Sequence, residues 1–410
     1  MDFIEKGGHS MSVIALPNRL FSHATLIDVL HDAGALGEGH PERFTLQFAP
    51  STFLPMSTTA LLTSWAMDVV ANGGTVEVEP NGASRAPYYL ARMDCFMHCG
   101  IDFPKPVSRQ AERGRFIPLQ LVDDAGSVQR AGDAICDLVL CHLDDAAAFL
   151  PAMEWAVNEI LDNVCNHAEA PRPGVMVAQH YPRERQLQIA VCDFGRGIHA
   201  SLSEAMPLAS HAEALARALE RGVTRNQAVG QGNGLAGSAA IMAANGGEFS
   251  LWSGDSMYRW RGGVGEYLPL ACCMPGTGVF LNMKTDRPVD LEETFIGDRD
   301  WSYLDVVAGQ VGDEGLRVAD ECAGFGTRAA AQPLRRRILG ILPRLEGPLT
   351  LDFAGIERAS SSFLDELLGR LVAEIGEETF RSRIRTINLA PRLARMADVV
   401  IHQRLTTETA

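Results

Sequence analysis

The stretch PAMEWAVNEILDNVCNHAEA (151–170) decides our prediction of the fold, because it joins a helical apolar stripe to a column of polar side chains. The apolar stripe is formed by Ala156, Val157, Ile160, Leu161 and Val164. Glu159, Asn163 and His167 stand four residues apart, so in a helix they lie one above another on one side. Taken alone, such a column is more typical of a solvated helix face than of a reactive one.

Two glycine-rich segments further along the chain change that interpretation. LQIAVCDFGRGI (187–198) predicts a buried strand ending at Asp193, whose carboxylate can accept a hydrogen bond from an exocyclic amine. Gly195 and Gly197 would let the backbone approach a ligand closely. GQGNGLAGSAAIMAANGGEF (230–249) places a glycine run at the start of a predicted helix, where backbone amides favour anions such as phosphate.

In this order, the segments resemble the GHKL ATPase superfamily, the fold shared by histidine kinases, anti-sigma factor kinases, gyrase and Hsp90. NEILDNVCNHA resembles its N-box, DFGRGI its first glycine box and GQGNGLAG its second, and PGTGVFLNM (275–283) resembles the closing glycine–threonine strand. The resemblance implies a Bergerat-type α/β sandwich in which ATP and Mg²⁺ bind between helices and a flexible lid, here residues 199–229.

The resemblance also implies a role for each matching position. Glu159 would be the catalytic, polarising base near the attacking group, and Asn163 would be the metal ligand that coordinates Mg²⁺. Asp193 would hold the adenine amine, while His167 and Asp162 would flank the metal. The other cofactor-binding positions would be Gly195 and Gly197 at the first glycine box, Gly232, Asn233 and Gly234 around the phosphates, and Thr277 beside the base.

A dinucleotide-binding fold is the main alternative for these glycines. Gly232-Asn-Gly234-Leu-Ala-Gly237 nominally matches that fingerprint, with Asp255 near the spacing of a ribose-binding acid. The fingerprint needs a strand immediately before its first glycine, whereas EALARALERGVTRNQAVG (213–230) predicts a helix and a loop. A Walker phosphate loop is absent from the sequence, so the GHKL interpretation is preferred.

Strands and helices alternate over about the first 120 residues, where the pattern predicts a last helix at about 85–98. In the centre it predicts a long helix at about 146–168 and strands at 248–252 and 278–284.

The two ends of the chain resemble each other. FTLQFAPSTFLPMSTTALL (44–62) aligns without gaps to LTLDFAGIERASSSFLDEL (349–367), and each segment follows a predicted strand and helix. The later copy resembles the STAS-like domains found beside GHKL modules in bacterial signalling proteins, and the first copy is more divergent. We therefore predict an α/β protein with STAS-like domains at 1–120 and 295–405 around a GHKL domain at 121–290. Whether the flanking domains pack on the centre or swing on linkers near 121–140 and 285–300 stays open at this point.

Anti-anti-sigma STAS domains carry a phosphorylatable serine at the start of the helix after this strand. The nearest positions here are Ser361 and Ser362, with Ser57 in the first copy. A serine in that place can instead cap the helix. We weigh capping above phosphotransfer, because Ser360 and Phe363 replace the usual aspartate and glycine.

Composition limits the partners. The chain has 410 residues, 46% hydrophobic and 21% charged, with a net charge of −15 and only three lysines. Such acidity argues against nucleic acid as a partner. The sequence has no apolar run long enough for a membrane span and no signal-peptide pattern at its start. Nine cysteines without a CxxC pair predict a reduced, cytoplasmic protein.

These observations predict a bacterial ATP/Mg²⁺-dependent signalling switch whose STAS-like domains relay its state to a protein partner. Whether phosphate passes to water, to a protein serine or to neither stays open at this point. The alternative from a different class is a non-catalytic scaffold that holds ATP as a structural ligand. GHKL modules often dimerise, so a homodimer is a further expectation.

Overall fold

The chain folds into two compact units, each described here by itself. The computed structural model describes residues 11–18, 22–36, 43–79, 82–104, 115–143, 145–220, 223, 234–296, 303–304, 306–307, 309 and 315–407. Unit 1 comprises Met1–Val122, His167–Arg217 and Gly246–Lys284, and unit 2 comprises Asp123–Asn166, Ala218–Asn245 and Thr285–Ala410. The three-domain boundaries expected from the sequence stay a prediction.

Unit 1 begins with a small parallel sheet. Its strands lie in the order β1-β2-β3, and parallel strands need crossover segments, which helices supply here. The elements are β1 (Met11–Leu16), α1 (His23–Asp32), β2 (Arg43–Phe48), α2 (Met56–Ala71), β3 (Thr75–Val78), α3 (Ala86–Arg92) and α4 (Cys95–His98). This confirms the predicted alternation with one difference. The single helix expected at 85–98 is two helices, because Asp94 adopts a left-handed φ of 61° between them.

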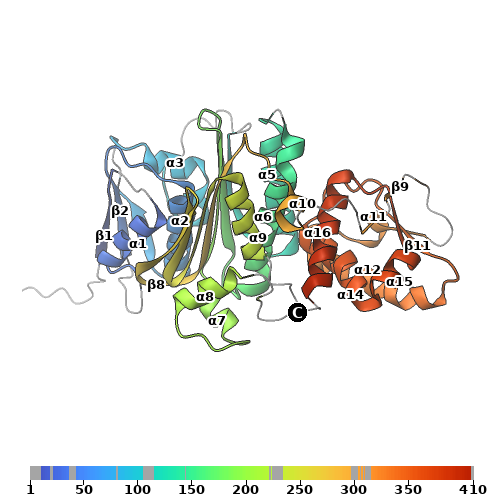
Figure 1. The fold of residues 1–410 in the computed structure, drawn as a ribbon. Helices are drawn as coiled ribbons and strands as arrows, with labels where there is room; N and C mark the ends of the chain where they lie inside the picture. Colours follow the sequence, from blue (N-terminus) through green and yellow to red (C-terminus); the bar gives the residue numbers. More distant parts are fainter. Residues whose placement is uncertain are drawn as a thin grey trace, which may run out of the picture. The chain divides into compact units, whose positions relative to one another are not determined.

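The second sheet of unit 1 has five antiparallel strands in the order β4-β5-β6-β8-β7. They are β4 (Phe116–Val122), β5 (Gly174–Tyr181), β6 (Gln186–Asp193), β7 (Glu248–Arg261) and β8 (Val264–Lys284). Helix α2 packs against β5, β6 and β8 (Figure 1). Trp65 of α2, Ala190 and Cys192 of β6 and Trp252 of β7 belong to one buried apolar cluster, so this sheet and the small one share a core.

The long β7–β8 hairpin was not predicted in full. Strands were expected at 248–252 and 278–284, but both extend to a two-residue turn at Gly262-Gly263. These glycines have φ of 60° and 85°, the positive values that a type I′ hairpin turn requires. The Gly-Gly pair between β-rich segments was the sequence feature that could have revealed the hairpin.

Three helices form the first part of unit 2: α5 (Ala125–Leu140), α6 (Ala146–His167) and α9 (Gly234–Asn245). Of the two alternatives left open for residues 121–140, the structure shows no extended linker there, because α5 occupies most of the segment. Asp124 and Ser127 form a reciprocal capping box at its start, with Ser127 N–H donating to Asp124 Oδ1 at 2.6 Å. The apolar face of α5 then buries Val128, Ala131 and Ile135.

The C-terminal part of unit 2 has a parallel sheet in the order β10-β11-β12-β9. Its strands are β9 (Val306–Val307), β10 (Gly315–Arg317), β11 (Leu349–Asp352) and β12 (Ile384–Ile387). The helices of this part are α10 (Leu291–Phe295), α11 (Val318–Glu321), α12 (Arg328–Ile341), α13 (Ser361–Leu364), α14 (Arg370–Ile375), α15 (Glu377–Arg383) and α16 (Pro391–Thr407), with a π-helical turn at Asp365–Gly369. Strand β11 lies between its sequence neighbours β10 and β12 as β2 lies between β1 and β3, which agrees with the gap-free alignment of 44–62 and 349–367.

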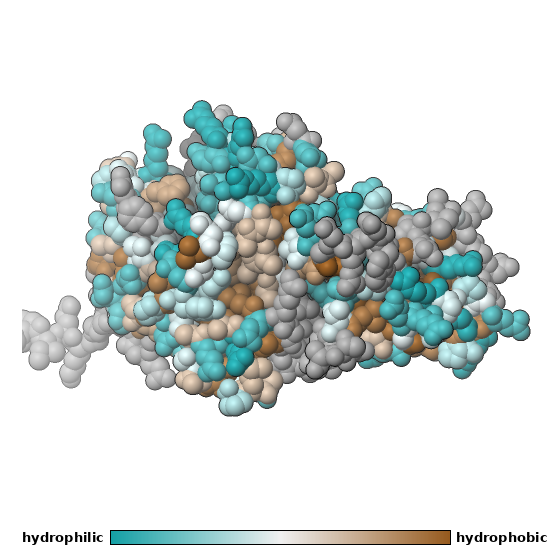
Figure 2. All heavy atoms as spheres, in the orientation of Figure 1, coloured by the Kyte–Doolittle hydropathy of each residue, from teal (hydrophilic) through white to brown (hydrophobic). Residues whose placement is uncertain are grey.

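Hydrophilic residues cover much of the face seen in Figure 2, with small hydrophobic patches scattered among them. Among the described residues, no helix is both long and apolar enough to cross a bilayer.

A buried charge network holds the C-terminal helices together. Asp365, only 3% exposed, accepts two hydrogen bonds from Arg404, at 2.7 and 2.6 Å, and one from Arg328 at 2.5 Å. Beside it, the fully buried Glu366 accepts from Arg335 at 3.0 Å and from Arg370 at 3.1 Å. Burial opposes ionisation, but Arg328 and Arg404 outweigh it and lower the pKa of Asp365.

We expect Asp365→Asn to lower the free energy of unfolding by about 3 kcal/mol, because it leaves two buried guanidinium groups without their carboxylate. Urea unfolding followed by circular dichroism measures this. Glu377→Gln, in the exposed α15 pair with Arg381, is the matched control and should cost about 0.5 kcal/mol or less. Equal costs for the two changes would contradict the structural role of the network.

Candidate functional site

Helix α6 carries three carboxylates that are withdrawn from bulk water. Glu154 is 6% exposed, accepts a hydrogen bond from Cys136 Sγ at 3.0 Å and lies 3.7 Å from Arg392. Glu159 is partly buried, and its Oε1 accepts from Ser361 Oγ at 2.7 Å. Asp162 is 5% exposed and hydrogen-bonds to the Ser362 hydroxyl. Two of these carboxylates therefore meet the serines at the start of α13.

The three consecutive serines have separate roles. Ser360 caps α13 by accepting from Phe363 N–H at 3.0 Å, and its hydroxyl lies 3.0 Å from that of Ser362. The expectation that Ser361 or Ser362 would cap the helix is therefore wrong. Their hydroxyls instead meet Glu159 and Asp162 of α6. Capping is also wrong for Ser57, because α2 begins after Pro55 without any side-chain cap, and Ser57 is 2% exposed.

Burial makes the carboxylates of Glu159 and Asp162 easier to protonate. It raises the pKa of Glu159, against the Ser361 hydrogen bond and the Arg328 charge, which lower it. The pKa of Asp162 rises to about 7 through burial, with a smaller contribution from Glu159. Asp162 Oδ2 is buried and has no hydrogen-bond partner among the described residues. This is an unusually reactive environment for two acids on one helix.

Helix α9 packs directly on α6 through its glycines. A Cβ added at Gly234 would lie 2.6 Å from Glu159 Oε2, and one added at Gly237 would lie 2.1 Å from the Trp155 ring. Ser238 Oγ also donates to the Ala156 carbonyl at 3.4 Å. Only glycine allows the approach of Gly237 to the Trp155 ring, and the predicted second glycine box begins its helix beside the flexible end of the Glu159 side chain. Gly232 and Asn233 lie outside the described residues.

Asn163 follows Glu159 by one helical turn and is partly buried, as is His167 one turn later. The Asn163 amide oxygen and the unpaired Asp162 Oδ2 are hard oxygen donors, the type that Mg²⁺ accepts together with phosphate oxygens and water. In donor type, Asp162 and Asn163 are therefore the residues of α6 that would hold an Mg²⁺ ion, whose charge would neutralise phosphate.

The first glycine box lies in unit 1, at the end of β6. Asp193 is 5% exposed and its Oδ1 accepts from Gly195 N–H at 2.8 Å. Asp193 pairs in register with Thr277 of β8, whose backbone N–H also bonds to the carboxylate. The structure therefore brings Asp193, Gly195 and Thr277 together.

The glycines of this loop are needed by the protein itself. A Cβ at Gly195 would lie 2.1 Å from the Ala168 carbonyl oxygen, and Gly276, at φ 71°, approaches the Asp193 carbonyl. Gly197, at φ 75°, lies against Ser253, which accepts from Ile198 N–H and donates to the Gly276 carbonyl. Ser253 was missed from the sequence because it lies in the hairpin that was not predicted. No local sequence pattern predicts that the Ser253 hydroxyl bonds to Ile198 and Gly276.

The described part of the predicted lid contains two helices joined by a non-helical segment at 203–210. Helix α7 (Gly197–Leu202) and helix α8 (His211–Ala218) occupy its first part. Arg196, just before α7, pairs with Glu169 at 2.9 Å and Glu204 at 2.6 Å. Most of the second part of the lid, residues 221–222 and 224–229, lies outside the described residues.

Comparison with known families adds one assignment. Residues 330–393 match the model of a family described as a STAS-like domain of unknown function (DUF4325). The C-terminal part of the chain contains a STAS-like domain. The match spans α12, β11, the serine-bearing α13 and β12, so the serines that meet Glu159 and Asp162 belong to it. No curated protein matches the sequence significantly.

Asp193 provides a pH-dependent test of its burial, which raises its pKa from 3.8 to about 6. As the pH rises from about 4 to 6, the unfolded chain releases this proton while the folded chain retains it. Stability therefore falls over this window, by about 3 kcal/mol in total. Asp193→Asn keeps an acceptor for Gly195 but removes the titration.

We expect the stability of Asp193→Asn relative to wild type to increase by about 3 kcal/mol between pH 4 and pH 7. Denaturant unfolding at a series of pH values measures it. Asp102→Asn, at an exposed carboxylate of the same unit, is the matched control. A constant difference between wild type and Asp193→Asn would show that Asp193 is not held in a low-polarity environment.

Proposed function

We propose that the chain is an ATP- and Mg²⁺-binding signalling switch of the GHKL type, whose C-terminal STAS-like domain covers the reactive carboxylate in one state. The observation that carries the proposal is the 2.7 Å hydrogen bond from Ser361 to Glu159. The STAS-like domain thereby touches the residue that the N-box resemblance assigns as polarising base. Contact between a reader domain and a catalytic carboxylate couples the two directly.

Features in each unit support nucleotide chemistry. In unit 2, Glu159 and Asp162 are acids in a low-polarity environment, and α9 begins against Glu159 with a glycine. In unit 1, Asp193 is an acceptor held by backbone N–H groups, suited to an exocyclic amine. Asn163 and Asp162 would serve Mg²⁺, and Glu159 would polarise the attacking hydroxyl or water.

The covering serines explain how the switch would change state. Ser361 is 0% exposed and Ser362 is 3% exposed, so neither has room for a phosphoryl group while it contacts α6. A nucleotide that needs Glu159 and Asp162 would compete with both hydroxyls. In this proposal, ATP binding releases the STAS-like domain, and a protein partner recognises the released domain.

The same contact favours a second candidate, serine kinase activity within the chain. Ser361 Oγ already lies at hydrogen-bond distance from a carboxylate able to take its proton. Once the site opens, Oγ would attack the γ-phosphorus while its proton passes to Glu159 and ADP leaves. This candidate needs the domain to move first, because Ser361 is buried.

We expect purified wild type to convert radiolabelled ATP with Mg²⁺ into inorganic phosphate or labelled protein. Glu159→Gln should lower that turnover by about 10²-fold or more, because a general base is lost, while ATP binding survives. Glu154→Gln, a buried carboxylate on the same helix that faces Cys136, is the matched control. Saturable binding without turnover in wild type would favour the non-catalytic scaffold, and no binding would overturn the proposal.

Ser361→Ala separates the switch from the kinase. If the serine covers Glu159, its removal should tighten ATP binding about tenfold, because one hydrogen bond to a charged group no longer competes. Ser382→Ala, an exposed serine of the same domain, should leave binding unchanged. If Ser361 is instead the acceptor, mass spectrometry of wild type should find phosphate there, and Ser361→Ala should lose it. Unchanged binding together with no phosphate would contradict both roles.

A further inference from the structure

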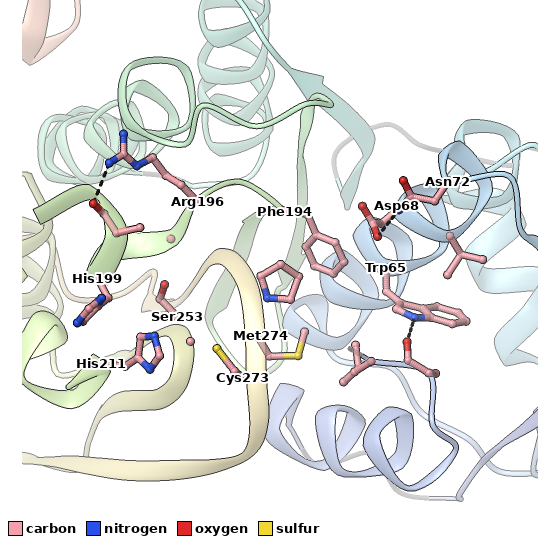
Figure 3. A pocket seen from close by; sticks show the side chains of 17 residues that line it. Trp65, Asp68, Asn72, Phe194, Arg196, His199, His211, Ser253, Cys273 and Met274 are labelled. Carbon is pink, nitrogen blue, oxygen red and sulfur yellow. Dashed lines mark hydrogen bonds between the residues drawn. The ribbon is translucent and has the colours of Figure 1, made fainter. Parts of the chain in front are cut away.

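Unit 1 contains a cavity of about 650 Å³ for which the nucleotide proposal names no occupant, although Gly197 and the first part of the predicted lid line it. It opens between α2, the loop that follows β6, the starts of α7 and α8, and the β7–β8 strands (Figure 3). Its volume lies within the range of about 300–1,000 Å³ that is usual for small-molecule sites. All of its walls come from this one unit.

The cavity lies on the opposite face of the sheet from the Asp193 carboxylate. Side chains alternate along a strand, and Ala190 and Cys192 of β6 point into the core shared with α2. Phe194 continues that series and lines the cavity, whereas Asp193 belongs to the other face. The cavity is therefore a separate site on the reverse of the same loop.

Most of the lining is apolar, and the polar groups at its far end are already engaged. Trp65 uses its indole N–H on the Ala35 carbonyl at 3.0 Å, so it offers the cavity only its ring. Asp68 is held by Arg172 and accepts from Asn72. Phe194 and Met274 stand in the middle of Figure 3, and Pro275 also belongs to this apolar wall.

Two imidazoles stand at the other end of the cavity. His199 and His211 pack edge to face, with ring centroids 4.9 Å apart. His211 is fixed by Asp255, 3.1 Å from its Nδ1, and by close contact with Gly254, where a Cβ would lie 2.4 Å from the ring. His199 comes from the first turn of α7 and lines the cavity as a hydrogen-bonding group. Figure 3 shows both rings opposite Trp65.

We propose that this cavity binds a small aromatic acid, with its ring against Trp65, Phe194 and Met274 and its acidic group at His199. Aromatic walls favour a planar apolar body, and an imidazole N–H is a donor suited to a carboxylate or sulfonate. The ligand would contact Phe194, Arg196 and Gly197, three residues of the first glycine box. This last step rests on the proposed function: the ligand would act on the first glycine box from the face of the sheet opposite the Asp193 carboxylate.

The test uses two fluorescent probes on the full-length chain. Anilinonaphthalene sulfonate is an aromatic acid, and N-phenylnaphthylamine is its uncharged counterpart. Ala200→Trp should fill the cavity from an exposed position of α7 and weaken both probes about tenfold or more. Ala205→Trp, an exposed position after α7 that does not line the cavity, is the matched control and should bind as wild type does. Probe binding unchanged by Ala200→Trp would overturn the site.

His199→Phe tests the acidic group separately, because it keeps the ring contact with His211. We expect it to weaken the sulfonate probe about tenfold and to leave the uncharged probe unchanged, since one charge-assisted hydrogen bond is lost. Equal effects on both probes would overturn recognition of an acid. ATP binding measured on Leu36→Trp distinguishes the two sites, because Leu36 lines the cavity but lies outside the first glycine box and the predicted lid. This variant should lose both probes and still bind ATP, and loss of ATP binding together with the probes would overturn a separate cavity.

Discussion

The burial of carboxylates on α6 is the constraint on which unit 2 depends. A charged carboxylate removed from water is costly unless hydrogen bonds or opposite charges replace its hydration. Glu154 is served by Cys136 and Arg392, Glu159 by Ser361 and Asp162 by Ser362. Each of these carboxylates draws a partner from the C-terminal part of the chain. The helix and the STAS-like domain therefore hold together through groups that a ligand could take over.

Glycines that match a ligand-binding motif can be required by the packing of the protein itself. Gly195 and Gly276 are required by close approach of the protein's own backbone, and Gly237 by close approach to the Trp155 ring. These contacts fix the loops and helix starts that a nucleotide would use. Glycine in these motifs thus serves packing first, and access to a ligand follows from the rigid backbone that packing produces.

Much of the fold could be predicted from periodicity, but contacts distant in sequence could not. The apolar stripe and its polar column located α6 to within one residue of its observed end, and the β2 and β11 alignment placed equivalent strands. The hairpin beyond Ser253 was not predicted, although two glycines at 262–263 favour the type I′ turn that joins its strands. The pairing of Ser361 with Glu159 spans 202 residues, and no single-sequence pattern encodes which serine faces which acid.

The three consecutive serines make different contacts, and the difference indicates a role of the STAS-like domain beyond its own folding. A serine needed only as a cap would point back to its own helix, and Ser360 alone does so. The hydroxyls of Ser361 and Ser362 instead hydrogen-bond to acids of α6, and burial raises the pKa of both acids. Because neutral and charged acids bind a hydroxyl with different strength, the contact responds to whatever changes the charge around α6. On the proposed function, phosphates and Mg²⁺ are the ligands that would change this charge, and the serine contacts are the place where that change would reach the STAS-like domain.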